Sequence, residues 1–423
     1  MGQHLWLDFG RFSWCPRELK TSVHENAYIF WTEKMGQAKS LFFTENKPTE
    51  TDLNDGPRSR EDNQVDVGVS YHEASTNPDV TENVQTDQAG GVQNENREQD
   101  LADVVLNRGQ GFHECEVLGS GPEAYESALT WKNCTKHPGH VDFIPISKFS
   151  SSGLAQFRPR QQQLIGSLVR NLSELTVRLR VHYTSTARPN GYCFSQLRGK
   201  NILHTGTGYV TGVQPGSGPC YCAECSQSPT PNHSWHQIKV YTACHVVYNA
   251  EEARSTQVDF FYDYDDEPEG VKSRMQTVWA VNTVATDPVG DWCMLMCATH
   301  DEALARKLET DQEELRGTVL FRSFEERDQD ALGICVVVSH PHGRRKHVTI
   351  GDIMNWSSQS SYTSEFLYTT KTCPGSSGAP VFCAVTDKAD KHSSRWLGPH
   401  SKGGLDEDLN MSGLSINCSN TAF

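Results

Sequence analysis

The stretch TVRLRVHY at residues 176–183 alternates polar side chains with apolar ones at Val177, Leu179, Val181 and Tyr183. A period of two is that of a β-strand with one buried face. Similar short runs follow at 206–213, 236–243, 257–262, 277–285, 291–297, 317–324, 333–340, 365–371, 379–385 and 410–417. Many short strands joined by turn-rich loops are typical of an all-β sandwich or barrel. The pattern therefore predicts a mainly β domain.

Two segments have the period of a helix instead. Residues 158–175 place apolar side chains on one stripe, at Leu164, Ile165, Leu168, Val169 and Leu172. This stripe predicts a helix that packs on the outside of the β domain. Residues 299–316 also read as a helix, with an acidic face toward solvent.

The segment 45–103 differs in composition from the rest of the chain. It holds 15 Asp and Glu, four Lys and Arg, and a single aromatic residue, Tyr71, so it carries −11 of the formal net charge of −15. Such a segment lacks the apolar side chains that would offset the entropy of ordering. We expect it to be disordered and solvated.

Bulk properties exclude several classes of protein. No basic patch suited to phosphate backbones stands out, which disfavours nucleic-acid binding. No apolar run is long enough to span a bilayer, and residues 1–20 have no h-region of a signal peptide, so we expect an intracellular protein without a membrane partner. The 14 cysteines are then expected to be reduced thiols or metal ligands. The sequence does not predict an oligomeric state.

Three short segments carry residues that could do chemistry. They are Thr242-Ala-Cys-His245-Val-Val, Asp291-Trp-Cys-Met-Leu and Pro374-Gly-Ser-Ser377-Gly-Ala-Pro. Each has a purely structural reading when taken alone: a satisfied core histidine, an aspartate that caps a turn, and a flexible linker. The third segment, however, lies between two apolar strands, where linkers are unusual.

Taken together, the three segments resemble the trypsin-like peptidases of the PA clan. That family has T-A-A-H, an aspartate opening D-x-x-x-L and a serine in G-x-S-G-x-P, and here the same order appears with separations of 46 and 86 positions. The resemblance is closest to the intracellular, HtrA-type branch, through Ser339-His-Pro-His-Gly343 and Val348-Thr-Ile-Gly351. It covers roughly residues 176–418 and implies a chymotrypsin-like double β-barrel.

The resemblance also implies a site and a reaction. His245 would be the general base, Asp291 would fix its tautomer, and Ser377 would attack the peptide bond and form an acyl-enzyme. The N–H groups of Gly375 and Ser377 would form the oxyanion hole. No cofactor is needed for this chemistry, and the partners would be protein or peptide substrates.

Two neighbours compete for these roles, and the family pattern is not fully kept. Ser376 is the competing nucleophile and Asp287 the competing acid, but neither fits the register of its motif. Ser376 stands where secreted trypsins carry Asp, and no I-V-G-G-type activation terminus is present. The zymogen salt bridge of secreted trypsins is therefore not expected here.

Two segments are expected to form the pocket for the side chain before the cleaved bond. The base of the pocket for the cleaved residue should come from 368–373 and its wall from 410–417. Lys371, six positions before Ser377, argues against cleavage after Arg or Lys and favours an acidic or polar residue. His340 could line the same pocket, or it could cap a loop at the end of its strand.

A second group of residues suits a metal. Cys220, Cys222 and Cys225 lie within six residues and are followed by His233 and His236. Thiolates and imidazoles are the usual ligands of a tetrahedral structural zinc ion. The alternative is a loop with free thiols.

These inferences give a domain plan and a function. Residues 1–140 are expected to form a largely disordered acidic region, 141–175 a linker and packing helix, and 176–423 the peptidase domain. The predicted function is that of a serine endopeptidase. The alternatives are a catalytically silent protein-binding domain on the same fold and a zinc-dependent binding module centred on 220–236.

Overall fold

The computed structural model describes ten stretches of the chain. They are residues 112–119, 121–150, 154–155, 157, 159–265, 273–320, 333–358, 363–386, 393–406 and 409–418. All belong to the unit Thr86–Phe423. The acidic segment 45–103 lies outside the described residues, so its expected disorder stays a prediction.

The first of two β-barrels is built from six strands. They are β4 (Thr176–Val181), β5 (His204–Pro215), β6 (His236–Thr242), β7 (Thr256–Phe260), β8 (Gln276–Asp287) and β9 (Trp292–Thr299). Their antiparallel order is β5-β4-β7-β8-β9-β6, and pairing of β5 with β6 closes the barrel. Val177, Leu179 and Val181 of β4 are fully buried in the core of this barrel, as predicted, but Thr176 and Arg178 on the opposite face are buried too, so β4 is not the half-buried strand that its alternation indicated.

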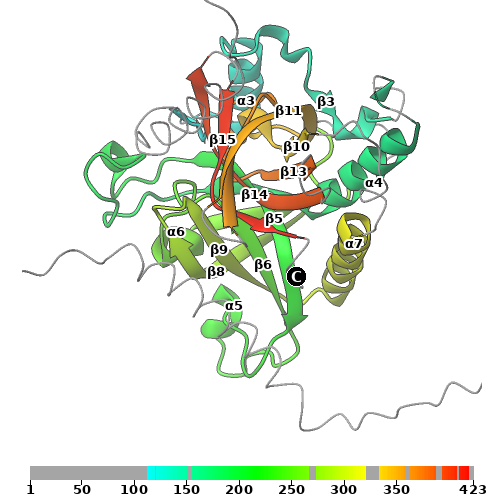
Figure 1. Ribbon diagram of the computed structural model, residues 1–423. Helices are drawn as coiled ribbons and strands as arrows, with labels where there is room; N and C mark the ends of the chain where they lie inside the picture. Colours follow the sequence, from blue (N-terminus) through cyan, green and yellow to red (C-terminus); the bar gives the residue numbers. More distant parts are fainter. Residues whose placement is uncertain are drawn as a thin grey trace, which may run out of the picture. The chain divides into compact units, whose positions relative to one another are not determined.

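The second barrel follows in the chain and is closed in the same way. Its strands are β10 (Ile334–Ser339), β11 (His347–Ser358), β12 (Thr363–Tyr368), β13 (Pro380–Thr386), β14 (Ser393–Asp406) and β15 (Leu409–Ser412). They run in the order β12-β11-β10-β13-β14-β15, and β15 pairs back to β12. Strand β16 (Ser415–Asn417) pairs with β12 and β14. The predicted double β-barrel is confirmed, and Figure 1 shows the two barrels as the green and the orange-to-red strands.

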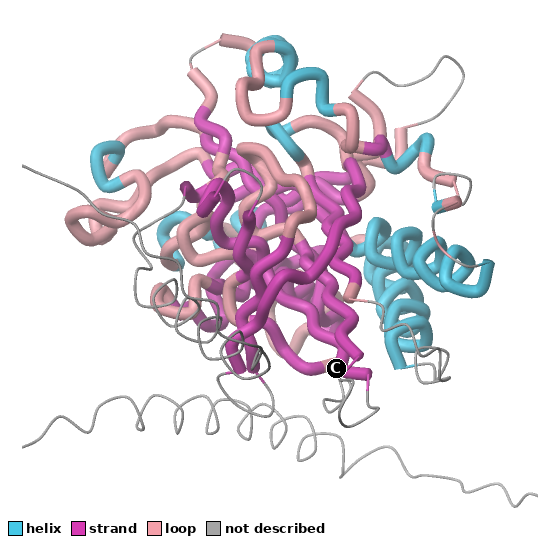
Figure 2. The backbone as a smooth tube through the Cα atoms, turned by 45° about the horizontal axis from the view of Figure 1, so that its top comes forward, coloured by secondary structure: helices cyan, strands magenta, loops and turns pink. Residues whose placement is uncertain are grey.

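Helices lie outside the barrels, as Figure 2 shows. They are α3 (Glu123–Lys132), α4 (Pro159–Leu175), α5 (Ala223–Ser226), α6 (Ala250–Arg254) and α7 (Glu302–Leu320). The helix predicted for 158–175 is confirmed as α4, and it packs against α7. None of the helices in the described stretches is long and apolar enough to cross a membrane.

One predicted strand is wrong. The run 317–324 begins inside α7, which continues through Leu320, while residues 321–324 lie outside the described residues. Leu315 and Val319 are both buried and four positions apart, so they continue the apolar stripe of the helix. The Thr318 hydroxyl donates to the Glu314 carbonyl, four positions earlier, at 3.0 Å, a spacing that belongs to a helix and not to a strand.

The chain before α4 contributes short elements to both barrels. Strand β1 (Phe112–His113) pairs with β14, β2 (Glu116–Val117) pairs with β5, and β3 (Ile144–Pro145) pairs with β11. Residues 112–119 and 121–140 come from the region predicted to be largely disordered. They lie in the part of the chain that the structure describes, and β1 and β2 place residues 112–117 against both barrels.

Candidate active site

His245 and Asp291 meet at the end of the β6–β9 pair. Thr242 of β6 is in register with Cys293 of β9, so the residues just beyond both strand ends come together. The Nδ1–H of His245 lies 2.8 Å from Oδ2 and 3.0 Å from Oδ1 of Asp291, and the backbone N–H of His245 donates to Oδ1 at 3.0 Å. The imidazole ring and the backbone N–H of His245 therefore both bind the carboxylate of Asp291.

Ser377 approaches His245 from the second barrel. Its loop precedes β13, and its Oγ lies 2.6 Å from Nε2 of His245. The loop is pressed against β5, where the N–H of Thr207 donates to the Ser377 carbonyl at 2.7 Å. Gly378 has a φ of +81°, and a Cβ there would lie 2.1 Å from the Thr242 hydroxyl. Only glycine permits both the turn and this approach.

The electrostatics favour an ionised Asp291. Burial by itself would raise the pKa of this carboxyl, but the charge and hydrogen bond of His245 hold it well below its usual range. A hydrogen bond from the Ser401 hydroxyl lowers the pKa further. The carboxylate can therefore stabilise a positive imidazole beside it.

The competing residues have other partners. The Ser376 hydroxyl accepts from the Cys373 N–H and donates to the Ser339 hydroxyl, both at 3.2 Å. Asp287 accepts from the N–H of Val289 at 3.1 Å, as a residue that caps a turn does. Neither residue contributes to the line that joins Asp291, His245 and Ser377.

The N–H groups of Gly375 and Ser377 converge on one oxygen atom. They donate to the backbone carbonyl of Glu114, at 2.6 and 3.1 Å respectively. The positive φ of Gly375, +94°, belongs to the turn that directs these groups. The pair predicted as an oxyanion hole is therefore brought together on a carbonyl, and this carbonyl belongs to the same chain.

The Glu114 side chain occupies a buried pocket that the sequence did not predict in full. His400 Nε2 donates to its Oε2 at 2.7 Å, and the Lys136 ammonium pairs with Oε1. Burial would raise the pKa of Glu114, but the hydrogen bond and charge of His400, followed by Lys136, lower it to about 2. The pocket thus holds a carboxylate in its ionised form.

Residues from both stretches expected to form the pocket, 368–373 and 410–417, lie near the partners of the Glu114 carboxylate. Tyr368 lies 2.6 Å from His400 Nδ1, while Thr372 and Asn410 lie 3.4 and 3.3 Å from the Lys136 ammonium. Lys371 instead pairs with Asp142 at 3.1 Å.

His340 does not contact Glu114. Its Nδ1–H donates to the Arg344 carbonyl at 2.8 Å, and its ring stacks on Tyr262. It caps the loop after β10, which was the alternative to lining the pocket.

The cysteine loop gathers a different histidine from those predicted. Cys220, Cys222 and Cys225 lie with His300, and their ligand atoms are within 4.8 Å of one another. Cys225 Sγ is 3.6 Å from His300 Nε2. His300 follows β9, so its approach depends on the pairing of β9 with β6 and could not be read from the loop's own spacing. His233 and His236 are not part of this group.

Comparisons with known proteins agree with the fold. Residues 230–387 match the family model of the trypsin-like peptidase domain, and this range includes His245, Asp291 and Ser377. The double barrel and this match show the class of domain: the chain contains a trypsin-like peptidase domain. No curated protein matches the sequence.

Solved structures similar to this chain include three proteases. The active form of the Rv3671c protease from M. tuberculosis is 14% identical, with 60% of this chain and 81% of that one covered and a TM-score of 0.31. For Deg5 the identity is 13%, the coverage 61% and 90%, and the TM-score 0.32. The HtrA-type protease AlgWS227A with a decapeptide is 13% identical, with 60% of this chain and 62% of that one covered and a TM-score of 0.29. At such low identities, membership of the HtrA-type branch stays a prediction.

Proposed function

We propose that this chain is a serine endopeptidase that works through an acyl-enzyme on Ser377. His245 takes the proton from the serine hydroxyl as Oγ attacks the carbonyl carbon of the scissile peptide bond. The 2.6 Å separation of Ser377 Oγ and His245 Nε2 supports this role, because proton transfer needs hydrogen-bond contact.

Asp291 has the position of a group that orients the base. Its carboxylate accepts the Nδ1–H of His245, which leaves the lone pair of Nε2 facing Ser377. As His245 becomes positive during the attack, the ionised carboxylate stabilises it. The same imidazolium then donates its proton to the leaving amine, and a water molecule repeats the sequence in reverse to release the acyl group.

The developing oxyanion would be held by Gly375 and Ser377. Their N–H groups already converge on a carbonyl oxygen, at 2.6 and 3.1 Å. Donors fixed in advance need no reorganisation when charge appears, and one such donor is commonly worth about 3 kcal/mol in the transition state. The convergence of these two N–H groups, next to the hydrogen-bonded side chains of Asp291, His245 and Ser377, is the single observation that carries the proposal.

A fluorophosphonate probe tests the proposal directly. We expect it to label wild-type protein at Ser377, to leave Ser377→Ala unlabelled, and to label Ser376→Ala. Absence of labelling and of turnover in folded wild-type protein would overturn the proposal and favour a silent protein-binding domain on the same fold.

The cysteine loop is proposed to hold a structural zinc ion. The N–H of Cys222 donates to Cys220 Sγ, and the N–H of Cys225 donates to Cys222 Sγ, both at 3.4 Å, as suits thiolates in a closed metal site. Zinc analysis of the full chain should give one equivalent less for Cys222→Ser than for wild type. Equal zinc content in the two proteins would refute a site here.

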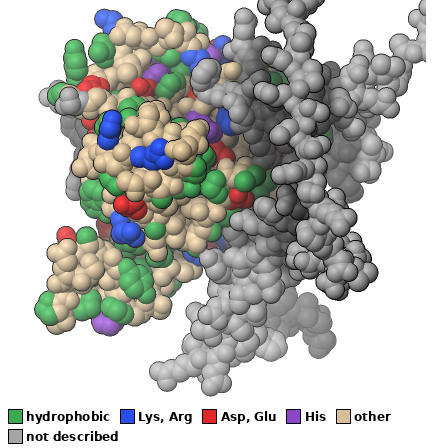
Figure 3. Space-filling view, turned by 90° about the vertical axis from the view of Figure 1, so that its left-hand side faces the viewer, with side chains coloured by type: hydrophobic (Ala, Val, Ile, Leu, Met, Phe, Trp, Pro, Cys, Tyr) green, Lys and Arg blue, Asp and Glu red, His purple; other side chains and the backbone are tan. Residues whose placement is uncertain are grey.

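Other aspects of the function stay predictions. They are the intracellular location and the absence of nucleic-acid and membrane partners. Figure 3 shows one face of the molecule, on which acidic and basic side chains are interspersed.

A further inference from the structure

Residues 112–117 lie across the candidate site as an extended peptide. Phe112 pairs with Gly403 and His113 with Lys402 of β14, while Glu116 pairs with Thr205 of β5. The segment is thus held as an added antiparallel strand on each side of the Glu114–Cys115 peptide bond. Strand addition of this kind is a common way to bind an extended peptide.

The peptide bond between these two strands lies at the reacting groups. The carbonyl oxygen of Glu114 accepts from both Gly375 and Ser377 N–H groups. The next residue is Cys115, and burial raises the pKa of its thiol well above the usual value. An extended chain whose carbonyl sits between these donors presents the carbonyl carbon to the serine hydroxyl.

The pocket explains why glutamate occupies this position. Its two carboxylate oxygens are matched by one donor each, from His400 and from Lys136. His400 is oriented in turn by the Tyr368 hydroxyl, which lies 2.6 Å from its second ring nitrogen. Aspartate would be one methylene too short for these contacts, and glutamine would leave Lys136 beside a neutral amide.

We propose that the chain cleaves its own Glu114–Cys115 bond and that the same pocket selects glutamate in other substrates. This inference rests on the proposed function. Ser377 Oγ forms an ester with the Glu114 carbonyl carbon, the C–N bond breaks, and Cys115 nitrogen leaves with a proton from His245. Water then hydrolyses the ester, so one water molecule is consumed and Glu114 gains a free α-carboxylate.

Expression of the full chain tests the cleavage. Wild type should give fragments 1–114 and 115–423, with Cys115 as a new N-terminus by sequencing, whereas Ser377→Ala should stay intact. Cleavage within one chain should proceed at a rate that does not change on dilution. Glu114→Ala should stay intact, and the matched control Glu126→Gln should be cleaved like wild type.

The Glu114→Ala chain separates failure of this inference from failure of the proposed function. It should still be labelled by the fluorophosphonate probe and should cut the peptide GQGFHECEVLG, residues 109–119, after the first of its two glutamates, the one equivalent to Glu114. If wild type stays intact while Glu114→Ala is labelled, the segment is an inhibitor and self-cleavage is refuted. If neither protein is labelled, the proposed function fails first.

Selectivity is tested with variants of the same peptide and of the pocket. Replacing its Glu114-equivalent residue by Gln or Asp should lower kcat/KM by roughly 10²-fold or more, because buried donors lose their partner. A Cβ at Gly403 would lie 2.5 Å from the Glu114 carboxyl carbon, so Gly403→Ala should abolish cleavage after glutamate. That variant should keep its fluorophosphonate labelling. Equal cleavage of the three peptides by wild type would refute selection of glutamate.

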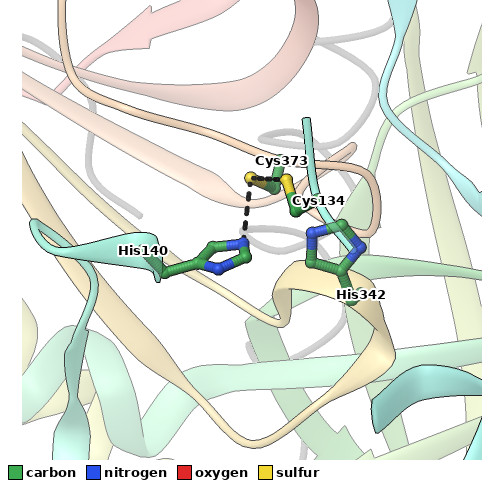
Figure 4. Close-up of side chains that lie close together, drawn as sticks. All are labelled: Cys134, His140, His342 and Cys373. Carbon is green, nitrogen blue, oxygen red and sulfur yellow. Dashed lines mark hydrogen bonds between the residues drawn. The ribbon is translucent and has the colours of Figure 1, made fainter. Parts of the chain in front are cut away.

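An independent observation points to a second metal site. Cys134, His140, His342 and Cys373 place one ligand atom each within 4.8 Å of the others, and three of the four are buried (Figure 4). Cys134 Sγ is 3.7 Å from Cys373 Sγ, which is 3.5 Å from His140 Nε2. Tetrahedral zinc with bonds of about 2.3 Å to sulfur and about 2.0–2.1 Å to nitrogen gives separations of about 3.7 and 3.5 Å.

His342 supplies the strongest pointer to a ligand. Its Nδ1–H donates to a Glu116 carboxylate oxygen at 2.6 Å, while its Nε2 is buried and has no hydrogen-bond partner in the described part of the chain. Histidines that bind zinc through one nitrogen commonly donate the other N–H to a carboxylate. We infer that these four residues bind zinc and tie residues 134–140 to Cys373, at the start of the loop that carries Ser377.

Metal analysis of the full chain tests this site. Cys134→Ser/His140→Asn should hold one zinc equivalent less than wild type, and the control Cys193→Ser should hold the same amount. In Cys222→Ser protein, where the other cluster is disabled, added Co²⁺ should still give the absorption of a tetrahedral thiolate complex. Zinc content unaffected by the double substitution, or a Cys134–Cys373 disulfide by mass spectrometry, would overturn the assignment.

Discussion

The imidazole of His113 stacks on that of His245, with ring centroids 3.9 Å apart and the planes inclined by 27°. The Nδ1–H of His113 donates to the Ser401 carbonyl at 3.2 Å. Burial, and then the neighbouring His245, lower the pKa of His113 to about 3. The segment that crosses the site is therefore bound with His113 in its neutral form.

Docking of residues 112–117 should consequently depend on pH. An undocked His113 titrates near its ordinary value of 6.5, and docking lowers this pKa to about 3, so docking is fully favoured above 6.5 and is lost progressively below it. Each pH unit below 6.5 should weaken docking by about 1.4 kcal/mol. Hydrogen exchange of β1 in uncleaved Ser377→Ala protein measures this effect. His113→Phe should remove the dependence between pH 6.5 and about 4.5, below which Glu114 of the same segment begins to titrate, and an unchanged profile in that window would contradict the explanation.

Single substitutions of the reacting pair should be non-additive. Ser377→Ala and His245→Ala should each abolish turnover of a glutamate peptide, and the double variant should be no worse, because the two act as one unit. Ser376→Ala should keep turnover within roughly tenfold while losing about 1 kcal/mol of stability with its buried hydrogen bonds. Steady-state kinetics and urea unfolding measure both. Loss of activity only in Ser376→Ala would show that the nucleophile is the other serine.

Asp291→Asn should lower kcat rather than raise KM. An amide in place of the carboxylate can donate to Nδ1 of His245, which puts the imidazole proton on Nε2 and removes the base facing Ser377. The expected drop in kcat is roughly 10⁴-fold. The kcat and KM values of the variant decide the matter: a raised KM with unchanged kcat would mean that Asp291 acts in substrate binding.

Stability near His245 should depend on a buried ion pair. Arg188 and Glu252 have fully buried side chains, 2.6 Å apart, and Arg188 also donates to the His245 carbonyl at 3.0 Å. Glu252→Gln should cost about 3–5 kcal/mol because it leaves a buried guanidinium without its charge partner. Denaturant unfolding should show this loss, while the exposed control Glu313→Gln should stay within about 0.5 kcal/mol of wild type. A Glu252→Gln value as small as that of the control would contradict the reasoning.

Much of the fold could be predicted from local patterns in the sequence. The alternation in residues 176–183 and the apolar stripe of α4 follow from the repeat of a strand and of a helix, so they can be read without the structure. The strand predicted at 317–324 is wrong where α7 continues through Leu320, because a run as short as Gly-Thr-Val-Leu at 317–320 fits either period.

The reacting residues could be named because their motifs are short and keep a known order. The sequence could not show that Glu114 lies beside His400, which is 286 positions away, or that His300 joins the cysteine loop. Nor does anything local distinguish Glu114 among the 53 acidic residues of the chain.

The sequence by itself indicated a mainly β chain, because strand periodicity is a local property, and its short motifs, through their resemblance to a peptidase family, pointed to His245, Asp291, Ser377 and Gly375. Only the tertiary structure decided what lies in the site. Residues 112–117 are held there by backbone pairing with β14 and β5, and backbone hydrogen bonds leave little trace in side-chain pattern. The pocket for Glu114 likewise exists only where the second barrel and residues 134–140 bring His400 and Lys136 to one carboxylate.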